Sequence, residues 1–138
     1  MKVQAVSELS AYRQAFALQE AIFHVSQRWP REEAYSLTDQ IRRASRSVGA
    51  NLTEAWAKRR YPAHFLAKLT DADGELAETG HWLNTALACH YLDATTADQL
   101  LASQRLVGRL LGSMIRQYVT FCPPVDSEAR CAGESVNR

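Results

Sequence analysis

The strongest constraint on the fold is an apolar repeat in the middle of the chain. Apolar residues and one threonine recur there at alternating spacings of four and three, namely Phe65, Leu69, Ala72, Leu76, Thr79, Leu83 and Ala86. This spacing keeps one stripe on one side of an α-helix, as in a coiled coil, whereas a strand requires a spacing of two. A second stripe with similar spacing comprises Leu37, Ile41, Ala44, Val48, Leu52 and Ala55. The two stripes predict two long helices.

Breaks in the pattern predict where the first two helical segments begin and end. The first segment runs from about Ser7 to Trp29 and ends at Trp29-Pro30, because proline disfavours the helical conformation of the residue before it. Its predicted stripe comprises Tyr12, Phe16, Gln19, Phe23 and Ser26, with Ala15, Ile22 and Trp29 beside it. The second segment opens at Ser36, which we predict to be an N-cap with Asp39 completing a capping box.

The remaining breaks predict two further helices and a tail. Pro62 suits the first turn of the third segment, and Thr95-Thr96 are candidate caps for the fourth, which Pro123-Pro124 ends. The fourth stripe comprises Leu100, Gln104, Val107, Leu111, Met114 and Tyr118. Four helices with short connections predict an all-α, up-down-up-down antiparallel four-helix bundle over residues 1–124. Residues 125–138 lose this periodicity, so we expect a flexible C-terminal tail there.

Composition supports a helical protein and excludes several other classes. The 138 residues are 46% hydrophobic and include only 6 glycines and 4 prolines, which argues against a turn-rich β fold. Apolar runs are far shorter than the roughly twenty residues of a membrane span, and no signal peptide is visible, so we expect a cytoplasmic protein without membrane contact. The 3 cysteines form an odd set without C-x-x-C spacing, which argues against disulfides and a four-cysteine zinc site.

The sequence offers little support for catalysis. Glu78-Thr79-Gly80-His81 is an E-x-x-H pattern, but a di-iron bundle needs a second such pair and further carboxylates, and these are missing. No serine or cysteine nucleophile stands in a recognisable setting beside a histidine. We therefore expect no enzyme activity, no cofactor and no metal, and a metalloenzyme is only a distant third hypothesis.

Basic side chains form the most informative pattern. In the second segment Arg42 and Arg46 share a flank with Gly49 and Thr53, Arg43 lies near by, and Lys58, Arg59 and Arg60 close the segment. In the fourth segment Arg105, Arg109, Gly112 and Arg116 repeat this spacing opposite the apolar stripe. Each flank forms a cationic rail roughly 16 Å long, and a row of arginines suits a line of phosphates because guanidinium binds phosphate oxygens bidentately.

The charge pattern by itself leaves three interpretations open. The rails bind nucleic acid, or they pair with the acidic residues Asp71, Glu75 and Glu78 of the third segment, in the same chain or in a neighbouring copy. In the third interpretation they are simply solvated. The formal net charge of +1 does not decide among these interpretations.

The second segment and its surroundings also carry a resemblance to a known family. The run from Gln40 to Glu54, with Trp29-Pro30 before it and Gly74-Glu75-Leu76 after it, resembles the bacterial four-helix-bundle proteins encoded in 23S ribosomal RNA intervening sequences. That family includes the accessory variability protein of diversity-generating retroelements. The similarity covers about residues 8–122, although Ala55 replaces the family glycine and the usual serine of the third segment is replaced around Asp71–Asp73.

The resemblance implies a non-enzymatic homopentamer that forms a ring, with nucleic acid and, in the retroelement branch, a reverse transcriptase as partners. It implies structural roles for Gln40, Ser47 and Asn51 in hydrogen bonds between helices, and for Glu54 in pairing with Arg43 or Lys58. The resulting hypothesis is an oligomeric bundle that binds structured RNA or a DNA/RNA hybrid through its arginines. The alternative is a protein-interaction scaffold whose basic faces contact acidic partners or sibling subunits.

Overall fold

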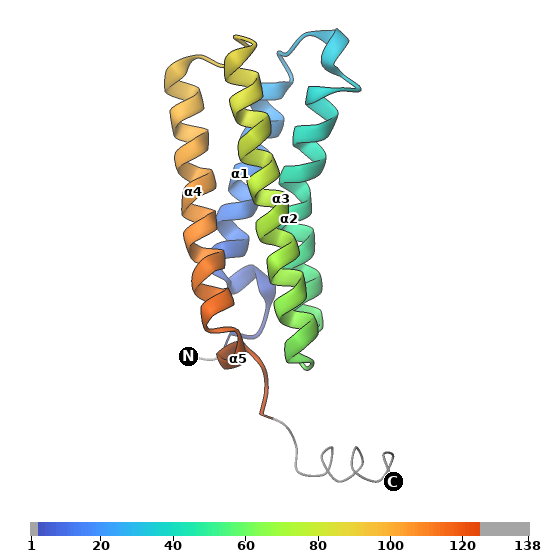
Figure 1. Ribbon diagram of the computed structural model, residues 1–138, viewed down its shortest axis with the longest axis vertical. Coiled ribbons are helices and arrows are strands. Elements are labelled where there is room, and N and C mark those ends of the chain that lie inside the picture. Colours follow the sequence, from blue (N-terminus) through green and yellow to red (C-terminus); the bar gives the residue numbers. More distant parts are fainter. Residues whose placement is uncertain (1–2, 125–138) are drawn as a thin grey trace.

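Four long antiparallel helices stand side by side in the computed structural model, which describes residues 3–124 (Figure 1). They are α1 (Ser10–Ser26), α2 (Leu37–Ala57), α3 (Pro62–Ala88) and α4 (Ala94–Arg116). Short helical turns η1 (Val6–Glu8) and η2 (Arg31–Glu33) precede α1 and α2, and α5 (Tyr118–Phe121) follows α4. All four predicted helical segments are present, and the described residues contain no strand. The tail predicted over 125–138 lies outside the described residues.

Each long helix packs against two others and lies diagonally opposite the third. α2 packs between α1 and α3, and α4 packs between α3 and α1. Within the described residues, α2 and α4 have no Cα atoms within 8 Å of each other, and neither do α1 and α3. The α2–α3 connection, the C-terminal end of α4 and the short α5 all lie at one end of the bundle (Figure 1).

The core lies along the predicted stripes of α2 and α3 and along most of the α4 stripe. Every residue of the α2 and α3 stripes is buried, and Phe65, Leu69 and Leu83 are completely inaccessible to solvent. In α4, Val107 and Leu111 are fully buried between the other helices. No helix among the described residues is both long enough and apolar enough to cross a membrane.

The prediction for the first helix is correct for Ser26 and for the neighbouring Ala15 and Ile22, but wrong for the aromatic residues of the stripe. The residues of α1 that face the core are Ala11, Ala15, Leu18, Ile22 and Ser26, whereas Phe16 is 47% exposed. Tyr12 and Phe23 lie at the edge towards α2, where Tyr12 approaches Gly49. The side of α1 that is buried faces both α2 and α4. Small residues such as Ala11 and Ala15 suit the close packing of the helices there, so the larger Tyr12 and Phe23 lie at the edge of this side.

Helix ends also differ from the prediction. Extended backbone at Leu9 delays α1 to Ser10, three residues beyond the predicted start. Ser36 precedes α2 as expected, but its side chain makes no capping hydrogen bond. The fourth helix begins at Ala94 because Asp93 caps it: an Asp93 carboxylate oxygen accepts the Thr96 backbone N–H at 2.7 Å. Asp93, and neither threonine, is therefore the N-cap.

Candidate nucleic-acid interface

The arginines of α4 form an exposed cationic row. Arg105, Arg109 and Arg116 are all exposed, on the side of α4 opposite the buried Val107 and Leu111. None of the three forms an ion pair within residues 3–124. We call these three residues the α4 rail, and at 1.5 Å per residue it is roughly 16 Å long. The predicted rail on this helix is thus open to solvent.

Glycine at position 112 shapes the rail. A Cβ atom at Gly112 would lie 3.3 Å from an Nη atom of Arg116, so the missing side chain leaves room for this guanidinium to lie along the helix. In the sequence pattern Gly112 simply interrupts the row of arginines. In the structure, the long Arg116 side chain reaches back along the helix to Gly112.

The acidic residues of α3 do not neutralise the α4 rail within the described part of the chain. Asp71 lies 3.7 Å from Lys68, and Glu78 accepts a hydrogen bond from the Trp82 indole at 3.2 Å. Glu75 is half-buried between these two carboxylates. Burial, then repulsion from Glu78 and Asp71, raises the pKa of Glu75 above its ordinary value. The hypothesis of pairing within one chain is therefore wrong for the α4 rail.

The raised pKa of Glu75 predicts a pH-dependent effect of removing its charge. Glu75→Gln should increase the free energy of unfolding at pH 7 by up to about 0.5 kcal/mol, because the charged form is disfavoured in the folded protein. The gain should shrink as the pH falls through the folded-state pKa and vanish below the unfolded-state value of about 4.3. Urea denaturation at several pH values measures this effect. Asp73→Asn, an exposed α3 carboxylate, is the matched control, and a gain that persists at pH 4 would contradict the assignment.

The arginines of α2 are already engaged with α1. Arg42 donates from Nε to the Ser26 hydroxyl at 2.9 Å, and its guanidinium lies 4.7 Å from the centre of the Phe23 ring. The Arg46 guanidinium lies over the same ring at 5.3 Å. Phe23 thus holds both cations by cation–π contact, and Arg42 is only partly exposed. Sequence patterns do not reveal Ser26 or Phe23 as partners, because both are predicted on the core stripe of their own helix.

Arg43 lies apart from Arg42 and Arg46. It forms an exposed ion pair with Asp39 one turn earlier, at 3.8 Å. Because α2 and α4 are diagonally opposite, the arginines of α2 and the α4 rail are separate surfaces on one molecule. One rigid ligand cannot lie along both rails of a single bundle.

The end of α2 carries the third group of cations. Lys58, Arg59 and Arg60 follow one another where α2 turns into α3, and no ion pair involves them within residues 3–124. Arg59 lies 4.1 Å from the centre of the Trp56 ring and donates to the Trp56 backbone carbonyl at 2.9 Å. Lys58 and Arg60 remain exposed.

The residues that carry the family resemblance are mostly linked within α2. The Ser47 hydroxyl donates to the Arg43 carbonyl at 2.7 Å, and the Asn51 amide donates to the Ser47 carbonyl at 2.9 Å. Gln40 is exposed and makes no side-chain hydrogen bond to described residues. The expected bonds between helices are therefore wrong, because the Ser47 and Asn51 side chains bond instead to backbone carbonyls one turn earlier in α2.

Glu54 does connect two helices, but through a different partner. Its carboxylate lies 2.8 Å from Lys68 of α3, and this hydrogen-bonded ion pair lowers the pKa of Glu54. The predicted pairing with Arg43 or Lys58 is wrong. Lys68 lies beside the α3 stripe, and only the antiparallel register of the two helices brings it opposite Glu54.

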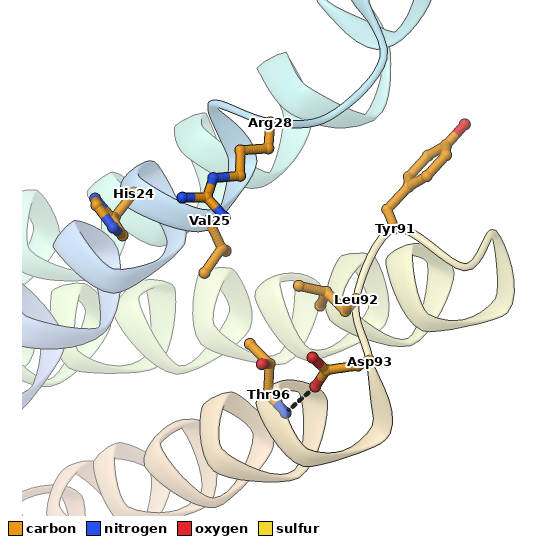
Figure 2. A pocket seen from close by; sticks show the side chains of 7 residues that line it. All are labelled: His24, Val25, Arg28, Tyr91, Leu92, Asp93 and Thr96. Carbon is orange, nitrogen blue, oxygen red and sulfur yellow. Dashed lines mark hydrogen bonds between the residues drawn. The ribbon is translucent and has the colours of Figure 1, made fainter.

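A pocket at the end of the bundle where α4 begins is lined by none of the residues predicted to bind nucleic acid. It has a volume of about 210 Å³, and its lining includes His24 from α1, Arg28 just after α1, and Leu92, Asp93 and Thr96 at the start of α4 (Figure 2). The Asp93 carboxylate caps α4, and Tyr91 points away from the other side chains (Figure 2). Within residues 3–124 no three metal-ligating side chains come together, and Glu78 and His81 of the E-x-x-H pattern are both exposed.

Comparison with known proteins places the chain in a family. The family model for 23S rRNA-intervening sequence proteins matches residues 7–113, which include all of α1 to α3 and most of α4. The chain belongs to the 23S rRNA-intervening sequence protein family. The resemblance seen in the Gln40–Glu54 run is thereby confirmed, and the match includes Arg105 and Arg109 of the α4 rail.

A solved structure shares the fold of this 23S rRNA-intervening sequence protein. It is the 1.70 Å crystal structure of a protein of unknown function from the S23 ribosomal protein family of Bacteroides thetaiotaomicron VPI-5482. The two chains are 24% identical with a TM-score of 0.70, over 77% of this chain and 95% of the other. This similarity supports the helical fold and says nothing of a ligand. No curated protein matches the sequence.

Proposed function

We propose that this protein binds nucleic acid, as structured RNA or a DNA/RNA hybrid, and that its contribution is binding and not catalysis. The observation that carries the proposal is the α4 rail, in which three exposed arginines have no acidic partner within residues 3–124. A phosphate backbone supplies a regularly spaced line of negative charge, and guanidinium groups bind its oxygens bidentately. Such binding recognises shape and charge more than base sequence.

Salt dependence tests this proposal on the unmodified protein. Each phosphate neutralised releases counterions, so the logarithm of the affinity should fall linearly with the logarithm of the salt concentration, with a slope near −0.9 per contact. Three rail contacts predict a slope of about −3 or steeper. Fluorescence anisotropy with a labelled RNA hairpin between about 50 and 200 mM salt gives this slope. An affinity that does not change with salt, or no binding at about 50 mM salt, would refute the proposal.

The second candidate is a scaffold in which copies of the chain bind one another. Its support is the acidic row Asp71, Glu75 and Glu78 on α3, in which Glu75 has no ion pair within residues 3–124. The rail of one copy facing the acidic row of the next would form a head-to-tail interface, and such interfaces close into rings when the rotation permits. We propose a homopentameric ring for this assembly, the number that the family resemblance implies. Mass measurement in solution tests it directly.

A further inference from the structure

An exposed aromatic pair lies beside the cations at the end of α2. Tyr61 is 58% exposed and stands just before α3, where Pro62 begins the helix. The His64 ring meets the Tyr61 ring edge-on, with 5.9 Å between ring centres. We call Lys58, Arg59, Arg60, Tyr61 and His64 the α2–α3 corner. More than half of the Tyr61 side chain is therefore open to a ligand from solvent.

The corner combines two flat surfaces with free positive charge. Arg59 is held in place by its hydrogen bond to the Trp56 carbonyl and by cation–π contact with the Trp56 ring. Arg59 stays partly exposed, so the guanidinium still reaches solvent. Lys58 and Arg60 flank Arg59 in the chain and are exposed. Base stacking on aromatic rings and guanidinium planes, with cations along the backbone, is how proteins hold unpaired nucleotides.

The corner lies at the end of the bundle that the α4 rail approaches. Gln104 of α4 donates a hydrogen bond to the Leu76 carbonyl of α3. Because α3 and α4 run antiparallel, this contact places Arg116 near the level of His64 along the bundle axis. Figure 1 likewise shows the end of α4 and the α2–α3 connection at the same end. The end of the rail and the corner therefore lie at the same level along the bundle axis.

We infer that the α2–α3 corner binds an unpaired nucleotide, in a single strand or a loop, by stacking its base on Tyr61 while Lys58 and Arg60 hold the flanking phosphates. This inference rests on the proposed function and adds the class of nucleic acid that the protein prefers. A base within a duplex is already stacked on its neighbours, so it gains no further stacking energy from Tyr61. The corner thus favours unpaired segments over continuous duplex.

The test compares single-stranded and duplex probes on full-length variants. Tyr61→Ala should weaken binding of a labelled oligouridylate of about ten nucleotides by about 5- to 150-fold, the loss expected for one stacked base, and leave binding of a blunt RNA duplex unchanged. Tyr61→Phe keeps the ring and should bind as the unmodified protein does. Tyr35→Ala removes an even more exposed tyrosine, 95% accessible, from the other end of the bundle and is the matched control.

Photocrosslinking gives a second readout. An oligouridylate carrying 5-iodouridine should crosslink to Tyr61 and leave Tyr35 unmodified, as mapped by mass spectrometry. Equal losses for single strand and duplex on Tyr61→Ala, or crosslinks away from the corner, would overturn the inference while leaving the proposed function intact. If neither probe binds the unmodified protein, the proposed function itself fails, so the two failures are distinguishable.

Discussion

Changing Arg105, Arg109 and Arg116 together to glutamate should weaken RNA binding by about 100- to 1000-fold at 100 mM salt. Each arginine supplies a charge-assisted contact of about 1.5–3 kcal/mol, and a tenfold change in affinity corresponds to about 1.4 kcal/mol, so two lost contacts at the weak end of this range already give a loss of about 100-fold. The salt slope should also become shallower by about three. All three side chains are exposed, so the fold should persist. Fluorescence anisotropy and circular dichroism measure these two results.

A matched pair of double variants separates the rail from net charge. Arg105→Glu/Arg109→Glu and Arg28→Glu/Arg31→Glu change the formal charge equally, and all four arginines are exposed. Only the first pair should weaken RNA binding strongly. If both pairs weaken it equally, binding is a general effect of charge and the rail is not the site. If the rail variants instead become monomers, the scaffold of head-to-tail copies gains support.

Phe65→Ala should destabilise the protein by about 3–5 kcal/mol, the largest effect on folding that we expect from one substitution. Phe65 is completely buried at the start of α3, and its ring lies 6.1 Å from that of Phe121 in α5. Removal of the ring leaves a cavity that the helices cannot fill by relaxing, and a domain of this size has only about 5–15 kcal/mol of stability in total. The midpoint of urea denaturation measures the loss.

The control for this prediction is another phenylalanine in the same bundle. Phe16 is 47% exposed on α1, so Phe16→Ala should cost less than about 1 kcal/mol. Near-equal losses for the two variants would mean that the Phe65 ring is not buried as the structure has it. Phe65→Leu retains most of the apolar volume and should recover a large part of the stability if cavity formation is the cause.

The sequence predicted the α2 and α3 core stripes correctly because each helix faces the core with one narrow side. Spacings of four and three then leave little choice, and Leu69 and Ile41 are buried as expected. For the first helix, the predicted stripe was wrong at its aromatic residues. Its large aromatics suggested a core stripe, but its small residues permit closer packing, so Ala15 is buried and Phe16 is exposed. The large size of the aromatic residues therefore favoured the wrong side of the helix, although the periodicity was equally compatible with the side that contains Ala15.

The candidate site was predicted only in part. The position of the α4 arginines opposite the apolar stripe follows from the sequence, but the sequence left open whether α3 carboxylates pair with them. The partners of other charged residues do not follow. Arg42 meets Ser26 and Glu54 meets Lys68 only because neighbouring helices run antiparallel at one particular register. The spacing of residues within one helix does not determine the register between two helices.

The sequence alone determined that four helices form and which sides of α2 and α3 they bury, because both are set by local periodicity and by proline. The tertiary structure decided which cations remain free. It places α2 and α4 on opposite corners, so their arginines make two surfaces, and it brings Tyr61 and the end of the α4 rail to one end of the bundle. These relations depend on the order and the register of the helices in three dimensions. Both are determined by packing between segments that are distant in the sequence.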